Sequence, residues 1–295
     1  MSRLSPLTST LLIIVGSLAL LIAQTALWLT ASLYNQAYFT DTVVSVLKQE
    51  PVRQAMAEEV VTQTLVNRPL LQRLAGTYLQ PAVVGILGSS QFETMLRYAA
   101  NKFHAYAIAQ APQDIIIDIT TLKQVLILLT TLTDTSLETA LNPVDLPDQI
   151  TLIAADEIPA LHQTVAAAVW VGPLAIIIAL ALFVIAIGFS QDPAAETART
   201  GLIVAASALI FYLAVPYLNH ITSIYLPTAT SRTIYTALYT AFTTPLVYRL
   251  LNQVFIGLGL TTLVVLSKVI AKNRLISLAR RQPAPKKSTR KTKNP

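Results

Sequence analysis

Four long apolar stretches divide the chain into membrane-like and polar segments. Leu11 to Ala31, residues 165–189 and residues 201–218 carry no charge, and residues 246–269 are polar at their start but apolar from Val254 to Leu266. A helix needs roughly 20 apolar residues to cross the hydrocarbon core of a bilayer. The pattern therefore predicts an all-α membrane protein with four transmembrane helices.

Residues 32–164, between the first and second predicted spans, form the only long polar stretch, and their apolar residues recur mostly at spacings of three and four. This spacing predicts a mainly helical domain. Its clearest helix is expected over Gln91 to Gln110, with one apolar stripe made of Phe92, Leu96, Ala99, Phe103 and Tyr106. Two β-rich runs, Asp114 to Ile119 and Gln149 to Ile153, are candidates for one short β-hairpin.

Local signals predict the ends of the other helices of this domain. Thr40 or Asp41 can cap a helix that runs to Gln49. Pro51 suits the first turn of the next helix, which is expected to reach about Asn67.

The remaining segments are expected to be short. Residues 1–10 form an N-terminal segment, residues 190–200 a hydrophilic loop and residues 270–295 a basic disordered tail. Residues 219–245 are rich in Thr and Tyr and predict a loop with an interfacial helix from about Ser231 to Thr243. The first span is interpreted as an uncleaved signal anchor, because its apolar run is longer than that of a signal peptide and no clean A-x-A site follows it.

Composition supports the membrane class. Hydrophobic residues make up 54% of the 295 residues and charged residues only 12%, and the mean hydropathy is +0.58, values outside the usual range of a soluble enzyme. There is no cysteine, which excludes disulfides, thiolate metal sites and a cysteine nucleophile.

Charge is segregated along the chain and predicts its orientation. Leu33 to Thr164 holds thirteen acidic and seven basic residues, whereas the chain from Lys268 onward holds ten basic residues and no acidic one. By the positive-inside rule, the tail and the N-terminus face the cytoplasm and residues 32–164 and 219–245 lie outside it. The tail is expected to contact anionic lipid headgroups rather than nucleic acid, through Arg280, Arg281, Lys286, Lys287, Arg290, Lys291 and Lys293.

No recognised catalytic, nucleotide-binding or metal-binding motif is present. His104, His162 and His220 have no second ligand at i+3 or i+4, so we expect solvated or hydrogen-bonded surface histidines, with no metal, no cofactor and no catalytic residue. Asp156 and Glu157 beside His162 allow a weaker hypothesis, an enzyme that acts on a lipid-linked substrate at the outer membrane surface.

Arg249, Asn252 and Gln253 form the one polar patch expected within a span, about one turn into the fourth. The favoured interpretation is an arginine that reaches the interface, and the alternative is a functional patch. Gly257-Leu-Gly259 allows a neighbouring helix to approach closely and is interpreted as generic bundle packing.

The junction between the first span and the following domain resembles bacterial integral membrane proteins of uncharacterised function. The resemblance rests on Tyr38-Phe39-Thr40-Asp41, on Val46-Leu47 and on the run from Glu50 to Ala57. Those proteins have one span, a helical outer domain and three further spans. The resemblance implies a multi-pass protein of the bacterial plasma membrane and supplies no catalytic residue.

Three functions are consistent with these observations. We expect a non-enzymatic envelope protein whose extracytoplasmic domain, residues 33–164, binds a partner protein, a lipid or an apolar ligand. The second hypothesis is an oligomeric transporter or channel subunit, in which the polar start of the fourth span lines a path. The third is the enzyme on lipid-linked substrates. The oligomeric state is not predicted.

Overall fold

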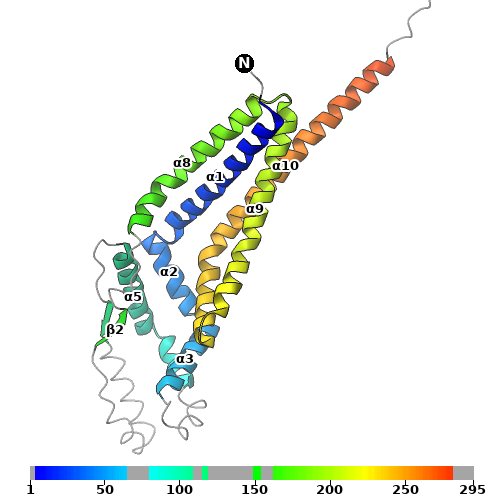
Figure 1. Cartoon of the computed structure of the whole chain (residues 1–295). Helices are drawn as coiled ribbons and strands as arrows, with labels where there is room; N and C mark the ends of the chain where they lie inside the picture. Colours follow the sequence, from blue (N-terminus) through cyan, green and yellow to red (C-terminus); the bar gives the residue numbers. More distant parts are fainter. Residues whose placement is uncertain (1–3, 65–79, 109–114, 119–148, 154–161, 282–295) are drawn as a thin grey trace, which may run out of the picture.

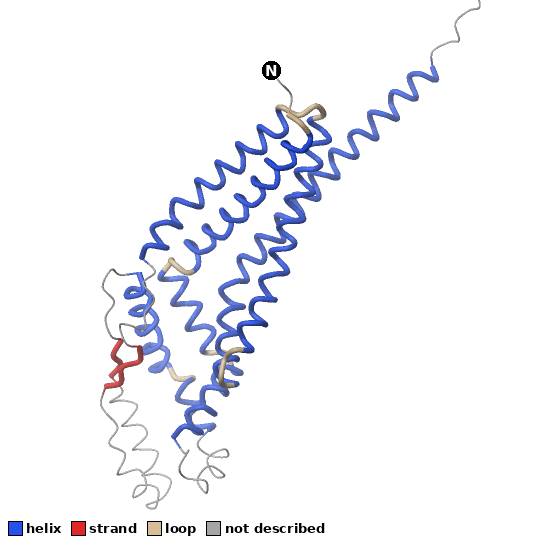
Figure 2. Tube along the Cα trace, in the orientation of Figure 1, coloured by secondary structure: helices blue, strands red, loops and turns tan. Residues whose placement is uncertain are grey.

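A computed structural model of the chain describes residues 4–64, 80–108, 115–118, 149–153 and 162–281. These residues are almost entirely helical, with one small two-stranded sheet (Figure 2). Four helices are long and apolar enough to cross a membrane: Pro6–Ser32, Ala167–Gly188, Pro193–Ile224 and Ala229–Asn273. The prediction of four membrane-spanning helices is thereby confirmed in number.

The four long helices form two antiparallel pairs (Figure 1). Helix α1 (Pro6–Ser32) packs along α8 (His162–Gly188), and α9 (Pro193–Ile224) packs along α10 (Ala229–Arg281). Many large apolar side chains on these helices are exposed; Ile210 and Ile256, for example, are each 70% exposed. Such a surface is suited to contact with lipid tails.

The two pairs meet at a small apolar cluster of Leu21, Val215, Leu246 and Leu250. The indole of Trp28 donates a hydrogen bond of 2.8 Å to the carbonyl of Phe242. This bond fixes the level of α10 relative to the last turns of α1. Residues 229–241 of α10 therefore extend about 20 Å past that level, at 1.5 Å per residue.

Of the described residues between the first two spans, residues 36–64 pack along this extension of α10, and residues 90–108 pack against residues 36–47 (Figure 1). The described residues of this segment form α2 (Gln36–Leu47), α3 (Glu50–Thr64), a short helix at residues 80–87, α5 (Ser90–Ile108), β1 (Ile115–Asp118) and β2 (Gln149–Ile153). We call this group the interspan domain. Thr230 at the start of α10 donates a hydrogen bond of 3.1 Å to the Ala55 carbonyl of α3.

Within the interspan domain, β1 pairs antiparallel with β2, with Ile117 opposite Ile150. The segment that joins the two strands lies outside the described residues. Pro51 lies in the first turn of α3, as predicted, but the predicted cap of the preceding helix was wrong by a few residues. Asn35, not Thr40 or Asp41, caps α2 by accepting a hydrogen bond from the Tyr38 amide, because Thr40 is buried and donates its hydroxyl to Asn101 instead.

The predicted loops between the last spans were too long. The 190–200 loop shrinks to a few residues because Asp192 caps α9 and Pro193 occupies its first position. The 201–218 span is likewise part of a longer helix. Only residues 225–228 separate α9 from α10.

The boundary predicted at Pro245 was also wrong. Residues 229–281 form one helix with Pro245 inside it, so the expected interfacial helix and the 246–269 span are continuous. A proline is tolerated there because neighbouring helices can satisfy the backbone group that it frees. The first twelve residues of the predicted 270–295 tail, including Arg280 and Arg281, belong to the same helix.

Candidate functional site

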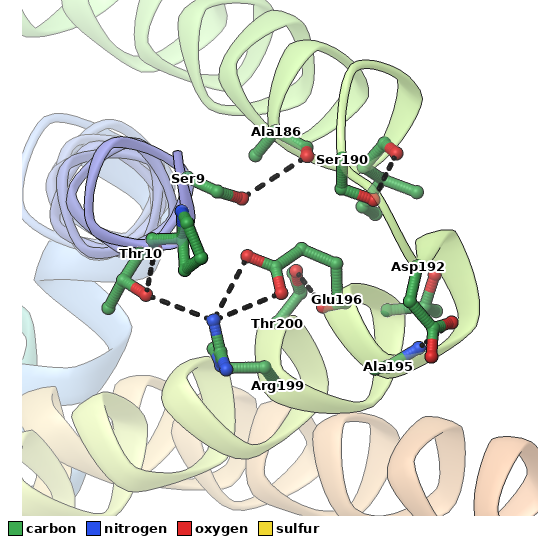
Figure 3. A network of polar contacts seen from close by, with 12 residues as sticks. Ser9, Thr10, Ala186, Ser190, Asp192, Ala195, Glu196, Arg199 and Thr200 are labelled. Atoms are coloured by element: carbon green, nitrogen blue, oxygen red, sulfur yellow. Dashed lines mark hydrogen bonds and ion pairs between the residues drawn. The ribbon is translucent and has the colours of Figure 1, made fainter. Parts of the chain in front are cut away.

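At the end of the bundle where the N-terminus lies, polar side chains join three helices (Figure 3). Glu196, whose side chain is only 7% exposed, forms an ion pair of 3.1 Å with Arg199 one turn later. The same guanidinium donates to the Thr10 hydroxyl at 3.2 Å. Ser9 donates to the Ala186 carbonyl, which links α1 to α8.

The start of α9 is also tied to α10. Lys268 lies 2.7 Å from Asp192, and this contact lowers the pKa of the Asp192 carboxyl more than the amide of Ala195 does. Both side chains are solvent-exposed, so the pair adds little stability. These polar groups satisfy one another, which indicates fastening of helix ends rather than a binding site.

The interspan domain is held together by a charged and an aromatic contact between α2 and α5. Arg97 pairs with Asp41 and Glu93, and Lys48 lies 2.6 Å from Glu93. Lys48, followed by Arg97, lowers the pKa of Glu93. Phe39 stacks on Phe103 of α5 and on Phe242 of α10, so one side chain joins the domain to the membrane bundle.

His104 was expected at the surface, and that prediction was wrong. It is 6% exposed, and its Nε2 lies 3.0 Å from the Leu33 carbonyl at the end of α1. Because a carbonyl only accepts, Nε2 carries the proton. Burial lowers the pKa of His104, against the smaller raising effect of the Leu33 and Tyr34 carbonyls. The buried residues of α5 are Ala99, Ala100, His104 and Ala107, and of these Ala99 belongs to the predicted stripe.

A groove of about 570 Å³ opens where the turn after α2 meets the extension of α10. Its lining residues are Gln49, Arg232, Thr233, Thr236, Ala237, Thr240 and Ala241. Arg232, Thr236 and Thr240 are exposed and repeat every four residues along one face of α10. The groove therefore has a cationic end at Arg232 and an alanine end next to the level of Trp28.

Arg232 is the single charged residue among those that line the groove. Its Nε donates to the Leu226 carbonyl at 3.0 Å, and its terminal nitrogens have no partner among the described residues. Glu50, which adjoins Gln49, is held by Arg53 and Gln54. The groove therefore presents a cation and hydroxyl groups, with no acidic side chain in its lining.

The predicted patch of Arg249, Asn252 and Gln253 lies along one side of α10 at three different degrees of burial. Asn252 is exposed, Arg249 is half-buried and Gln253 is 5% exposed. Arg249 was expected one turn into a helix, but α10 begins twenty residues before it. The structure thus places the patch in the middle of a long helix.

Most of the other predicted site residues lie outside the part of the chain that the structure describes. Asp156, Glu157, Lys286, Lys287, Arg290, Lys291 and Lys293 lie outside the described residues, and His162 is the first residue of α8. Among the described residues, no three His, Asp or Glu side chains are grouped closely enough to hold a metal ion.

The groove residues were not predicted from the sequence. The four-residue repeat of Arg232, Thr236 and Thr240 is visible in the sequence, but it has meaning only once residues 229–245 are recognised as helix. No local signal marks Gln49 as their neighbour. No protein-family model, curated protein or solved structure matches this chain.

Proposed function

We propose that this chain is a non-enzymatic membrane protein that binds the headgroup of a lipid in the groove between α10 and the turn after α2. The observation that carries the proposal is the polarity of that groove: Arg232 at one end, threonine hydroxyls along it, and Ala237 and Ala241 toward the other. A phospholipid has the same order, from an anionic phosphate to an apolar tail.

The position of the groove along α10 supports a lipid as the ligand. Trp28 suits the aromatic belt at a membrane interface, and its hydrogen bond places Phe242 at the same level. Ala241 adjoins Phe242, whereas Arg232 lies about 15 Å farther along the helix axis. A lipid at the rim of the bilayer would reach Ala241 first and present its phosphate toward Arg232.

We further propose that the interspan domain lies outside the cytoplasm of a bacterial plasma membrane, with both chain ends inside. The ten basic residues from Lys268 onward support this orientation. The groove then takes its ligand from the outer leaflet. The tail would bind anionic headgroups of the inner leaflet.

The test is retention of dihexanoyl-phosphatidylglycerol by the full chain in a mild detergent, measured by native mass spectrometry. Ala237→Trp fills the groove with an indole ring and should reduce the retained lipid at least about tenfold, because the ring occupies the space between Arg232 and Ala241. Ala206→Trp, on an exposed face of α9, is the matched control and should retain it. Equal retention by both variants would disprove the groove as the site.

A second candidate function, an oligomeric transporter or channel subunit, is favoured by one observation. Gln253 is buried among the helices, and neither its amide nitrogen nor its amide oxygen has a partner among the described residues. A polar path would use such groups. Liposome flux that is unchanged by Arg249→Ala and by Asn252→Ala would count against this function.

A further inference from the structure

Arg249 lies deep in the membrane-spanning part of α10. The Trp28 hydrogen bond sets Phe242 at the level of the last turns of α1, and Arg249 follows seven residues later, about 10 Å farther toward the centre of the bundle. Its neighbour Leu250 is fully buried against Leu21, near the middle of α1. Arg249 itself is half-buried and makes no hydrogen bond or ion pair with the described residues.

Two further polar side chains without partners lie on α10 and α1 near the level of this arginine. Gln253 is one turn along the same face of α10, a spacing that puts Cβ atoms about 5–6 Å apart. Ser17 of α1 is 1% exposed, and its hydroxyl has no partner within the described part of the chain. Leu21 of α1 and Leu250 of α10 pack in one cluster. Ser17 lies one turn before Leu21, and Gln253 lies about one turn after Leu250. Because the two helices run antiparallel, Ser17 and Gln253 are at the same level of the bundle.

The chemistry of these three groups favours an anion. Together they offer the N–H groups of a guanidinium, the two of an amide and one hydroxyl, against two acceptor oxygens. A buried polar group without a partner destabilises the fold. A water molecule can bridge Ser17 and Gln253 but leaves the charge of Arg249 uncompensated, whereas an anionic oxygen compensates the charge as well.

The surroundings of Arg249 indicate how the anion arrives. Tyr248, Phe255 and Ile256 of the same helix are 63% to 70% exposed, and Asn252 is exposed beside them. That side of α10 therefore faces lipid tails. The geometry points to a second binding site, in which Arg249, Gln253 and Ser17 bind the carboxylate or phosphate of a single-chain amphiphile that enters from the bilayer. This site is separate from the groove at Arg232.

The test is native mass spectrometry of the full chain in detergent micelles with three probes of equal chain length: oleate, oleyl phosphate and oleyl alcohol. The chain should retain both acids and not the alcohol. Arg249→Gln should reduce retained oleate at least about tenfold, the effect of one charged hydrogen bond. Lys272→Gln, which removes an exposed charge farther along α10, is the matched control and should leave retention unchanged.

Gln253→Leu keeps the proposal testable if Arg249→Gln does not fold. It removes an amide without a partner, so it should lower oleate retention several-fold while the melting temperature stays the same or rises. Equal retention of the alcohol and the acids, or wild-type retention by both Arg249→Gln and Gln253→Leu, would overturn the proposal. Displacement of oleate when gluconate is replaced by chloride would assign the site to an inorganic anion and overturn the amphiphile.

Discussion

At the residue scale, burial decides what each polar side chain can do. His104 has a titrating ring enclosed between α1 and α5, with its proton donated to the Leu33 carbonyl. Phe39 covers one side of the ring, at 5.2 Å between ring centroids. The neutral form of His104 is therefore the form that the fold accommodates.

This burial predicts a pH dependence of stability. Because burial lowers the pKa of His104 in the folded chain, the unfolded chain binds its proton at a higher pH, near the ordinary value of about 6.5. The contribution of neutral His104 to the free energy of unfolding is complete above that pH. It is lost as the pH falls from about 6.5 through the lower pKa of the folded state. The melting temperature of the chain in detergent should decrease between pH 7.5 and pH 5. His104→Gln, which cannot titrate, should show a smaller decrease; an identical decrease would contradict this assignment.

At the element scale, α10 is the longest element, with 53 residues, and it contacts both α9 and the interspan domain. It approaches α9 closely where Gly257 meets Gly201. A Cβ atom added at Gly257 would lie 2.5 Å from the Gly201 carbonyl oxygen and 2.9 Å from the Ala205 amide nitrogen. Two backbones can come this close only without side chains. The generic packing role predicted for this glycine is consistent with the contact.

Gly257→Ala should therefore separate α9 from α10 and destabilise the chain by about 1–3 kcal/mol, the usual effect of overpacking. Gly259→Ala is a matched control two residues away, because a Cβ atom there meets nothing within 4 Å. It should be neutral or slightly stabilising, since alanine favours a helix. Thermal unfolding in one detergent compares the two, and equal melting temperatures would refute the close contact.

At the scale of the whole molecule, the interspan domain is fastened to the membrane helices at a few points. Phe39 between Phe103 and Phe242 is one aromatic contact, and Thr230 on the Ala55 carbonyl is a polar one. The groove lies between α10 and Gln49, in the turn after α2. Its shape therefore depends on how α2 packs against α10. Rigid attachment of the domain is therefore a condition for the proposed lipid site.

Phe39→Ala should loosen this attachment at a cost of about 2 kcal/mol, less than for a fully buried phenylalanine. Amide hydrogen exchange should become faster in α2 and α5 while α8 and α9 keep their protection. Tyr98→Ala, at a side chain that is 54% exposed, should leave exchange unchanged. Faster exchange throughout the bundle would show that Phe39 stabilises the entire fold instead.

The proposed orientation is open to a direct test because the chain has no cysteine. A membrane-impermeant maleimide applied to intact cells should label Ser45→Cys in α2 and not Gln191→Cys in the turn before α9. Both positions are exposed, so lysed cells should show labelling of both. Labelling of Gln191→Cys alone in intact cells would reverse the proposed orientation.

The sequence by itself determined the membrane class and the number of span-length helices, because hydropathy over about 20 residues measures transfer into lipid and needs no knowledge of neighbours. It also indicated close helix packing at Gly257. It placed the ends of α9 and α10 wrongly, because Asp192-Pro193 is a cap signal inside a polar stretch and Pro245 is a break signal that a packed membrane helix tolerates.

Only the tertiary structure decided which residues meet. His104 is buried because α1 ends against α5, and Ser17 comes level with Gln253 because α1 and α10 run antiparallel. The groove joins Gln49 to Arg232, nearly two hundred residues apart. Such contacts depend on how elements pack in three dimensions, and no local pattern of hydrophobic and polar residues records them.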